Sequence, residues 1–393
     1  MDDATSPLLG GHQHGQLIPQ HVNPPRSVVN IPDPDPNNNN VGTAVAKIAE
    51  ILSSCQESLI NGEEMSIPYR TRPTRRAAAS GNPARPRPAP SVVRFPGRSA
   101  AEAAKFTQVF KILQLSLSAL LSGNPITKRN IYYQCQDLFG NSQTVVDRLV
   151  DDLAYTLGLG RDFLNIVATS KGIVAGPVIL LTRMSAAIDA STGDAGVLIP
   201  QPRNIGQIDF GTTQWVLETS TAGQGILITG KGYADLATRQ FVHTLHAARP
   251  ELPVLALVDY DPDGISIMRC YSHGSRAHAH EQGVTVPSLQ WLGVRSDDVA
   301  SRVACGGLGF DDQYVNGALG SINPLTQRDR KRARNIIKDL DEESDSHDVS
   351  CRRELQVMLF LGIKAEIQAM DDAGDMTAWL DEHMRGFLYG DVM

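Results

Sequence analysis

The chain has 393 residues, with 36 Lys and Arg against 43 Asp and Glu, which gives a formal net charge of −7. Hydrophobic residues make up 41% and charged residues 20%, so the composition excludes collagen, a mucin, a disulfide-rich scaffold and a wholly disordered chain. The length allows two or three domains, at about 100–200 residues each.

The first 40 residues are rich in Pro, Asn, His and Gly. Such a segment cannot bury enough apolar surface to offset the entropy lost on ordering, so residues 1–40 are predicted to be a disordered tail. They lack the apolar segment of a signal peptide, and no run in the chain approaches the about 20 apolar residues of a membrane span. The five cysteines are widely spaced. We therefore expect a soluble, intracellular protein with no membrane partner.

Residues 41–101 are expected to hold an isolated helix followed by a basic linker. Val, Ile and Leu recur at helical spacing over residues 42–60. Residues 65–101 contain many prolines, eight arginines and no acidic residue. Two interpretations stay open for this linker, which are a solvated tether and a segment that attracts phosphate or directs nuclear import.

Residues 102–183 are predicted to form three helices and a hairpin. Apolar periodicity predicts helices over three segments: Ala104–Leu121, a stretch after the candidate N-cap Thr127, and Ser142–Leu157. Two β-rich segments follow, Leu164–Thr169 and Gly172–Leu181, separated by a length that suits a tight turn. This is the order of a winged helix, a fold that commonly presents one helix to the DNA major groove.

From about Ile208 the pattern changes to α/β, and residues 184–393 are expected to form a second domain. Apolar runs at Gly225–Thr229 and Pro253–Val258 flank a helical stretch at Leu236–Ala248. A strand, a helix and a strand in this order predict parallel strands, with functional residues at their carboxyl ends.

Three carboxylates alternate directly after the second of these strands, at Asp259, Asp261 and Asp263. Carboxylate oxygens are the ligands that Mg²⁺ prefers, so the cluster predicts a divalent cation site. An EF-hand is excluded because the twelfth loop position is Cys270 instead of Glu. The alternative is an Asp-Pro-Asp-Gly turn with solvated carboxylates.

The first strand leads into a sequence that matches a phosphate-binding loop only superficially. Gly225 to Lys231 fits G-x-x-x-x-G-K, but Gly232 replaces the Ser or Thr that holds Mg²⁺, and the intervening residues are the strand itself. Nucleotide binding is therefore not expected. Lys231, at the strand end, remains a candidate contact for a phosphate.

The acidic residues are concentrated at the end of the chain. Residues 339–393 carry 14 acidic and 4 basic residues, a net charge of −10, so the other 338 residues carry +3. The overall charge is therefore no argument against a nucleic-acid partner.

Several segments, in order, resemble one family, which contains the topoisomerase VI A subunit together with its meiotic relative, the protein that makes recombination-initiating double-strand breaks. Lys128 to Tyr133 resembles its tyrosine motif, and Thr229–Arg239 and Leu257–Gly264 resemble its Toprim domain. Further matches are Ala168–Gly172 and Lys364–Gln368. The resemblance covers roughly residues 100–390, and its eukaryotic meiotic branch fits more closely.

The resemblance implies a fold and a reaction. The fold would be α+β, with a CAP-like winged-helix domain followed by an α/β Toprim domain. Tyr133 would be the nucleophile that forms a 5′-phosphotyrosyl bond with DNA, and Arg129 would assist it. The implied metal is Mg²⁺ and the implied metal ligands are Glu218, Asp259 and Asp261.

The resemblance also implies partners and a location. Lys128 and Lys231 are expected to contact double-stranded DNA. The chain would work as a homodimer or as a heterotetramer with a topoisomerase VI B-like ATPase subunit, because each tyrosine would act with the metal site of the other protomer. The expected location is the nucleus, on chromosomes.

Two departures from the family pattern stand out. Asn130 occupies a position where the family usually has Asp. Only eleven residues separate Glu218 from Gly230, about twenty fewer than the family uses to include a helix. Three hypotheses follow: an active DNA transesterase that initiates meiotic recombination, a catalytically impaired DNA-binding scaffold with an incomplete Toprim site, and a hydrolytic Toprim nuclease.

Overall fold

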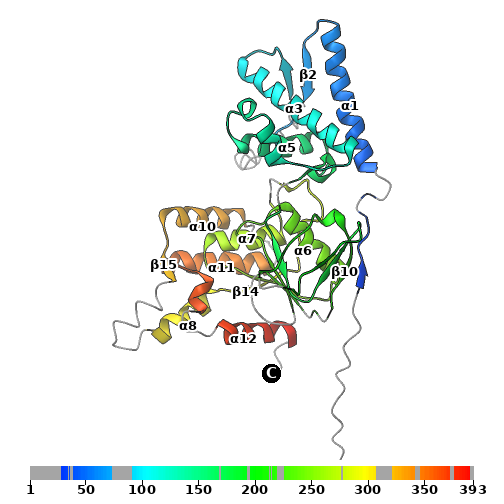
Figure 1. Cartoon of the computed structure of the whole chain (residues 1–393). Helices are drawn as coiled ribbons and strands as arrows, with labels where there is room; N and C mark the ends of the chain where they lie inside the picture. The colour runs from blue at the N-terminus through cyan, green and yellow to red at the C-terminus, as the bar shows by residue number, and fades with distance from the viewer. Residues whose placement is uncertain are drawn as a thin grey trace, which may run out of the picture.

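The computed structural model describes residues 28–33, 35, 39–72, 91–167, 170–192, 195–211, 213, 215–218, 225–275, 278–306, 321–340, 346–371 and 376–389. Most of the predicted tail, the centre of the basic linker and the last four residues of the chain lie outside these ranges. The helices α1, α3 and α5 lie together at one end of the molecule, and α6, α7, α10 and α11 lie around a sheet at the other end (Figure 1).

The first unit consists mainly of helices, with two short strand pairs, β2 Met65–Pro68 with β3 Val92–Phe95 and β4 Ile126–Thr127 with β5 Ile166–Val167. Its helices are α1 Asn39–Ile60, α3 Ala100–Ser122, α4 Lys128–Gln134 and α5 Gln143–Leu157. Thr127 caps α4, since its side chain accepts a hydrogen bond from the Asn130 backbone, 3.0 Å away. Gly123 ends α3 in the left-handed conformation. The three predicted helices are confirmed. They were predictable because their caps and apolar faces lie within the segments themselves.

The region before α3 differs from the expected isolated helix and linker. The helix α1 packs against α3, and its Ile48 and Cys55 are buried in the same apolar core as α3 and α5. The strands β2 and β3 pair antiparallel on either side of the arginine-rich segment. Ile67 and Val93 are buried there, so this pairing extends the core across what looked like a linker.

The predicted hairpin over residues 164–181 is wrong. The strand β5 Ile166–Val167 pairs in parallel with β4 Ile126–Thr127. The strand β6 Ile173–Ala175 joins the large sheet, and β7 Ile179–Thr182 joins a separate antiparallel sheet. The short spacing suggested a turn, but these strands bury Val174 and Leu180 against partners much later in the chain. Long-range burial outweighed the local turn preference.

The second unit contains a six-stranded sheet in the order β14-β13-β11-β12-β6-β9. Its parallel part consists of β11 Trp215–Glu218, β12 Gly225–Thr229, β13 Val254–Leu257 and β14 Gln290–Gly293, and β9 is Val197–Leu198. The helix α6 Leu236–Ala248 connects β12 to β13. The predicted parallel strand-helix-strand unit is confirmed, with β11 lying between its two strands.

A second, antiparallel sheet has the order β1-β10-β7-β8, with β1 Val28–Asn30, β8 Ala187–Asp189 and β10 Ile205–Asp209. The strand β1 lies in the stretch predicted to be disordered. It pairs with Gln207–Asp209, and the backbone N–H of Ile31 continues the pairing. The last part of the predicted tail is therefore held in the fold by backbone hydrogen bonds, which a composition argument does not detect.

The remaining described elements of the second unit are α7 Pro262–Ser272, α8 Ser296–Gly306, β15 Ile322–Pro324, α10 Gln327–Asp339, α11 Ser346–Leu361, β16 Ile363–Ala365, α12 Met376–Tyr389 and the short 3₁₀ helices η3 Pro202–Asn204 and η5 Ile367–Met370. The 3₁₀ helices η1 Asp137–Phe139 and η2 Arg161–Leu164 belong to the first unit, where Phe139 and Leu164 lie in its core. The strands β15 and β16 pair antiparallel, and Tyr260 bridges to Ala365. In the parts of the chain that the structure describes, no helix has both the length and the apolar character of a membrane span.

The helix α12 is held to α8 by an ion pair that titrates. His383 Nε2 lies 2.9 Å from Asp298 Oδ1, and the His383 ring stacks on Trp379. The hydrogen bond with Asp298 raises the pKa of His383 above its ordinary range. The folded state therefore favours the protonated imidazole, so this stabilisation is present below about pH 6.5 and is lost as the pH rises through the raised pKa.

We expect His383→Gln to remove this pH dependence. The midpoint of thermal unfolding of the variant should lie about 1–3 °C below that of the wild type at pH 5.5, since a partly exposed ion pair stabilises by less than about 1 kcal/mol. At pH 8.5 the difference should vanish. A difference that stays the same at both pH values would contradict the assignment.

Candidate active site: a tyrosine helix and an acidic strand end

The helix α4 presents Tyr133 to solvent. The Tyr133 side chain is 61% exposed, whereas Tyr132 is half-buried and Ile131 is fully buried. Arg129 is also exposed and precedes Tyr133 by four residues, which places the two side chains on one face of the helix. The two tyrosine rings lie 5.5 Å apart, centroid to centroid. The Tyr133 phenol and the Arg129 guanidinium therefore lie together on a solvent-accessible surface.

Lys128 does not share this exposure. Its side chain is buried, with Nζ 2.7 Å from Asp151 Oδ1 and 3.3 Å from the Asp147 carbonyl oxygen. Burial lowers the pKa of its ammonium group, and the Asp151 carboxylate opposes that effect. The contact of Lys128 with DNA stays a prediction, and it would require the ammonium to leave its carboxylate partner.

The predicted acidic cluster lies at the carboxyl end of β13. Asp259 is half-buried, and its Oδ1 accepts a hydrogen bond from the Ile367 backbone N–H at 2.9 Å. Asp261 caps α7, accepting a 2.6 Å hydrogen bond from the Gly264 backbone N–H. Burial raises the pKa of Asp261, and the neighbouring carboxylates of Asp259 and Asp263 raise it further. These carboxylates therefore repel one another, which a bound cation would relieve.

Asp263, the third carboxylate, is held elsewhere. Its Oδ1 accepts a hydrogen bond from the Tyr233 hydroxyl at 2.9 Å and pairs with Arg332 Nε at 2.8 Å. Sequence reasoning missed both partners, although Arg332 lies in the conspicuously basic helix α10. Asp263 thus has a structural role, and the candidate metal ligands reduce to Asp259 and Asp261 together with Glu218.

Glu218 is the last residue of β11, between β12 and β13. Its backbone is in register with Ile228 and with Ala256, three residues before Asp259. Its side chain lies outside the described part of the structure. Among the described side chains, the only close group of three candidate ligands is His273, His347 and Asp348, where Asp348 already pairs with Arg269. The structure therefore brings the predicted residues to one sheet edge without defining a complete ligand set.

The connection between β11 and β12 is short for adjacent parallel strands. It consists of residues 219–224, which lie outside the described residues. The register places Gly225 opposite Trp215, about 11 Å from Glu218. Seven Cα steps reach about 23 Å, so the connection closes, but it leaves no room for the helix of an ordinary crossover.

Lys231 follows β12 at the same sheet edge. It is exposed and has a positive φ of 52°, and its backbone N–H donates to Thr229 Oγ1 at 3.2 Å. Its carbonyl oxygen accepts a hydrogen bond from the Lys171 ammonium at 3.4 Å. Two lysines therefore lie close to the edge at which Asp259 and Asp261 lie, which provides positive charge for a polyanion.

Gly264 is required by the backbone of the acidic loop. A Cβ atom there would overlap the carbonyl oxygen of Asp259. We expect Gly264→Ala to destabilise the protein by about 1–3 kcal/mol and to weaken Mg²⁺ binding. Thermal unfolding and calorimetric Mg²⁺ titration measure both effects.

Gly42→Ala is the matched control, because Gly42 lies in α1 with open space around its Cα. Its substitution should leave Mg²⁺ binding unchanged and stabilise the helix slightly. If Gly264→Ala unfolded at the wild-type temperature and bound Mg²⁺ with wild-type affinity, the loop would tolerate the added Cβ atom and the prediction would be refuted.

Comparison with known proteins gives concordant matches. Residues 217–381 match the family model of the Toprim domain shared by Spo11 and the topoisomerase 6 A-subunit, and residues 104–166 match the model described as Type IIB DNA topoisomerase. The chain is 33% identical over 288 residues to the meiotic recombination protein SPO11 of Homo sapiens, covering 68% of this chain and 67% of that protein.

Two further relatives have similar coverage. The meiotic recombination protein rec12 of Schizosaccharomyces pombe is 32% identical over 274 residues, which cover 67% of this chain and 72% of rec12. The DNA topoisomerase 6 A-subunit of Arabidopsis thaliana is 29% identical over 294 residues, covering 71% of this chain and 65% of that protein. The two family models together span α4 and the acidic loop after β13.

Proposed function

The chain belongs to the family of Spo11 and the topoisomerase 6 A-subunit, and from that premise we propose that it is a DNA transesterase that makes double-strand breaks and so initiates meiotic recombination. The observation that supports this most strongly is the exposed pair Tyr133 and Arg129 on α4, within the segment that matches the Type IIB DNA topoisomerase model.

In this proposal the Tyr133 hydroxyl oxygen attacks a DNA phosphorus atom. The bond from phosphorus to the 3′ oxygen breaks, the 5′ end becomes a phosphotyrosyl ester, and the departing 3′ oxygen takes up a proton as the phenol loses one. A neutral phenol is a weak nucleophile near neutral pH. The Arg129 guanidinium, on the same helical face, would stabilise the negative charge that develops on the phosphate oxygens.

The donor set at the carboxyl end of β13 fits Mg²⁺. Asp259 and Asp261 offer oxygen atoms in a half-buried position, their charges repel one another, and Glu218 ends the adjacent strand. These three residues would hold the ion, which when bound supplies a positive charge for phosphate oxygens. The Gly264 backbone N–H keeps the Asp261 carboxylate oriented.

The proposal extends to domains and partners. Residues 102–183 would form a winged-helix domain that binds double-stranded DNA, without a wing at 164–181, and residues 184–393 the Toprim domain. The strands β6 and β7, within the first of these ranges, pair with strands of the second unit, so the boundary between the units lies before β6. Lys231 would contact a DNA phosphate. A homodimer, alone or in a heterotetramer with a B-like ATPase subunit, would place one tyrosine on each strand, and the protein would act on chromosomes in the nucleus.

One observation favours a second candidate function. The connection between β11 and β12 leaves no room for a crossover helix beside Glu218. If the Toprim metal site is incomplete for this reason, the chain would be a DNA-binding scaffold without cleavage activity. It would then bind DNA in a salt-sensitive manner through its basic residues.

Covalent trapping distinguishes these functions. The full chain, alone and with a B-type subunit, is incubated with plasmid DNA with and without Mg²⁺, denatured in detergent, and assayed for protein-linked DNA. The proposal predicts Mg²⁺-dependent linkage at 5′ ends. Salt-sensitive binding without linkage would indicate the scaffold, and breaks with free 5′ ends would indicate a nuclease.

A further inference from the structure

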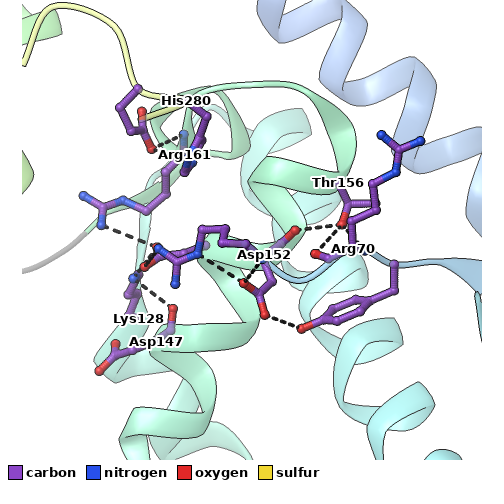
Figure 2. A network of polar contacts seen from close by, with 11 residues as sticks. Arg70, Lys128, Asp147, Asp152, Thr156, Arg161 and His280 are labelled. Carbon is purple, nitrogen blue, oxygen red and sulfur yellow. Dashed lines mark hydrogen bonds and ion pairs between the residues drawn. The ribbon is translucent and has the colours of Figure 1, made fainter. Parts of the chain in front are cut away.

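An ionic cluster of buried and half-buried side chains surrounds Asp151 on α5. Its carboxylate lies 2.7 Å from Lys128 Nζ, 3.2 Å from Arg72 Nη1 and 3.8 Å from Arg161 Nη1. Figure 2 shows the cluster, with Lys128 at the lower left and Arg161 and His280 above it. Burial raises the pKa of Asp151, but Lys128 and the two arginines outweigh burial and hold that pKa below its ordinary range. The carboxylate is thus an anion shared by three cations.

These cations come from three different segments. Lys128 is the first residue of α4, Arg72 follows β2, and Arg161 begins η2. Arg72 Nε also lies 3.1 Å from the neighbouring Asp152 carboxylate. Asp151 therefore joins the tyrosine helix, the start of the arginine-rich segment and η2 to α5.

Through η2 the cluster reaches the second unit. The Arg161 backbone N–H donates to Glu281 Oε1 at 3.2 Å, and the Gln240 amide of α6 donates to the Asp162 carboxylate at 2.8 Å. Arg203 donates to the Asp162 carbonyl oxygen at 3.0 Å. A continuous series of polar contacts thus runs from the first residue of α4 to the unit that carries the acidic loop.

The helix α4 depends on such contacts. It has seven residues, and so short a helix is unstable by itself in water. Its described anchors are the Thr127 cap, the buried Ile131, the half-buried Tyr132 on the apolar core and the Lys128 ion pair with Asp151. Tyr133 is mostly exposed, so its position is set by the anchors of its helix more than by its own packing.

We propose that Asp151 is a positioning residue. It fixes α4 through Lys128, and it couples the orientation of Tyr133 to the second unit through Arg161 and Glu281. This inference rests on the proposed role of Tyr133 in DNA cleavage. Loss of the Asp151 charge leaves buried cations without their shared partner, so α4 becomes the least constrained part of its unit.

The test combines hydrogen–deuterium exchange with cleavage kinetics. In Asp151→Asn, amide exchange over residues 128–134 should rise about tenfold, while exchange in α3 changes less than about twofold. The maximal rate of covalent complex formation should fall about tenfold, with an unchanged DNA concentration at half-maximal rate. The matched control is Glu50→Gln, which removes an exposed carboxylate from α1 of the same unit and should change neither measurement.

Lys128→Met is the second variant. Asp151 keeps both of its arginine partners in it, so the fold is less perturbed than in Asp151→Asn. It should show the same localised increase in exchange over α4. Unchanged exchange in both variants, or an equal increase throughout the unit, would overturn the proposal. The exchange result does not depend on cleavage, so it decides this inference even if Tyr133 proves not to be the nucleophile.

Discussion

Tyr133→Phe is expected to lower the yield of protein-linked DNA by about a thousandfold or more, to the background of the assay, because it removes the oxygen atom that attacks phosphorus. The substitution removes one atom from a side chain that is 61% exposed, so folding and DNA binding should be unchanged. Detergent trapping measures the yield, and circular dichroism checks the fold.

Tyr132→Phe is the matched control, since it makes the same chemical change in the adjacent ring, 5.5 Å away. It should retain cleavage within about threefold. Adjacent residues of a helix point in different directions, so the Tyr132 hydroxyl does not lie where the Tyr133 hydroxyl lies. If Tyr132→Phe abolished linkage and Tyr133→Phe did not, the nucleophile would be assigned to the wrong tyrosine.

Asp259→Asn is expected to raise the Mg²⁺ concentration needed for half-maximal cleavage by about a hundredfold or more, because a neutral amide is a poor ligand for a hard cation. Asn retains a carbonyl oxygen, which still accepts the hydrogen bond from the Ile367 backbone. The substitution therefore removes charge with little disturbance of the fold. Mg²⁺ titration of covalent complex formation measures the effect.

Asp263→Asn is the control for this prediction. It removes a carboxylate two residues from Asp261 that already pairs with Tyr233 and Arg332. Its Mg²⁺ requirement should stay within about threefold of the wild type, with a modest loss of stability. Equal Mg²⁺ requirements in the wild type and Asp259→Asn would show that Asp259 is not a ligand.

Local signals predicted the helices and the parallel β12-α6-β13 unit, but failed for the pairing of the strands over residues 164–181. The cap at Thr127, the terminal Gly123 and the apolar face of residues 142–157 lie within the segments they define, so sequence suffices. The partners of β6 and β7 lie further along the chain, beyond what spacing reveals. Similarly, β1 and β2 lie in segments whose composition suggested a tail and a linker.

The sequence motifs indicated where the candidate site lies in the fold, but they did not indicate which tertiary partners its side chains have. The position of Asp259 and Asp261 after a buried strand was predictable from the run of apolar residues before them. The tertiary partners of their neighbours were not, since Asp263 is held by Arg332 on α10 and Lys128 by Asp151 on α5. The sequence places a lysine beside the tyrosine motif but does not show that this lysine is buried in an ion pair.

The most direct test of the account is to identify the residue that carries the DNA. Covalent complexes are digested with nuclease and trypsin, and the nucleotide-bearing peptide is fragmented by mass spectrometry. Trypsin should release residues 130–148, which contain both tyrosines of α4. The account predicts a nucleotide phosphate on Tyr133 that depends on Mg²⁺, and an adduct on Tyr132, on another residue, or on none would contradict it.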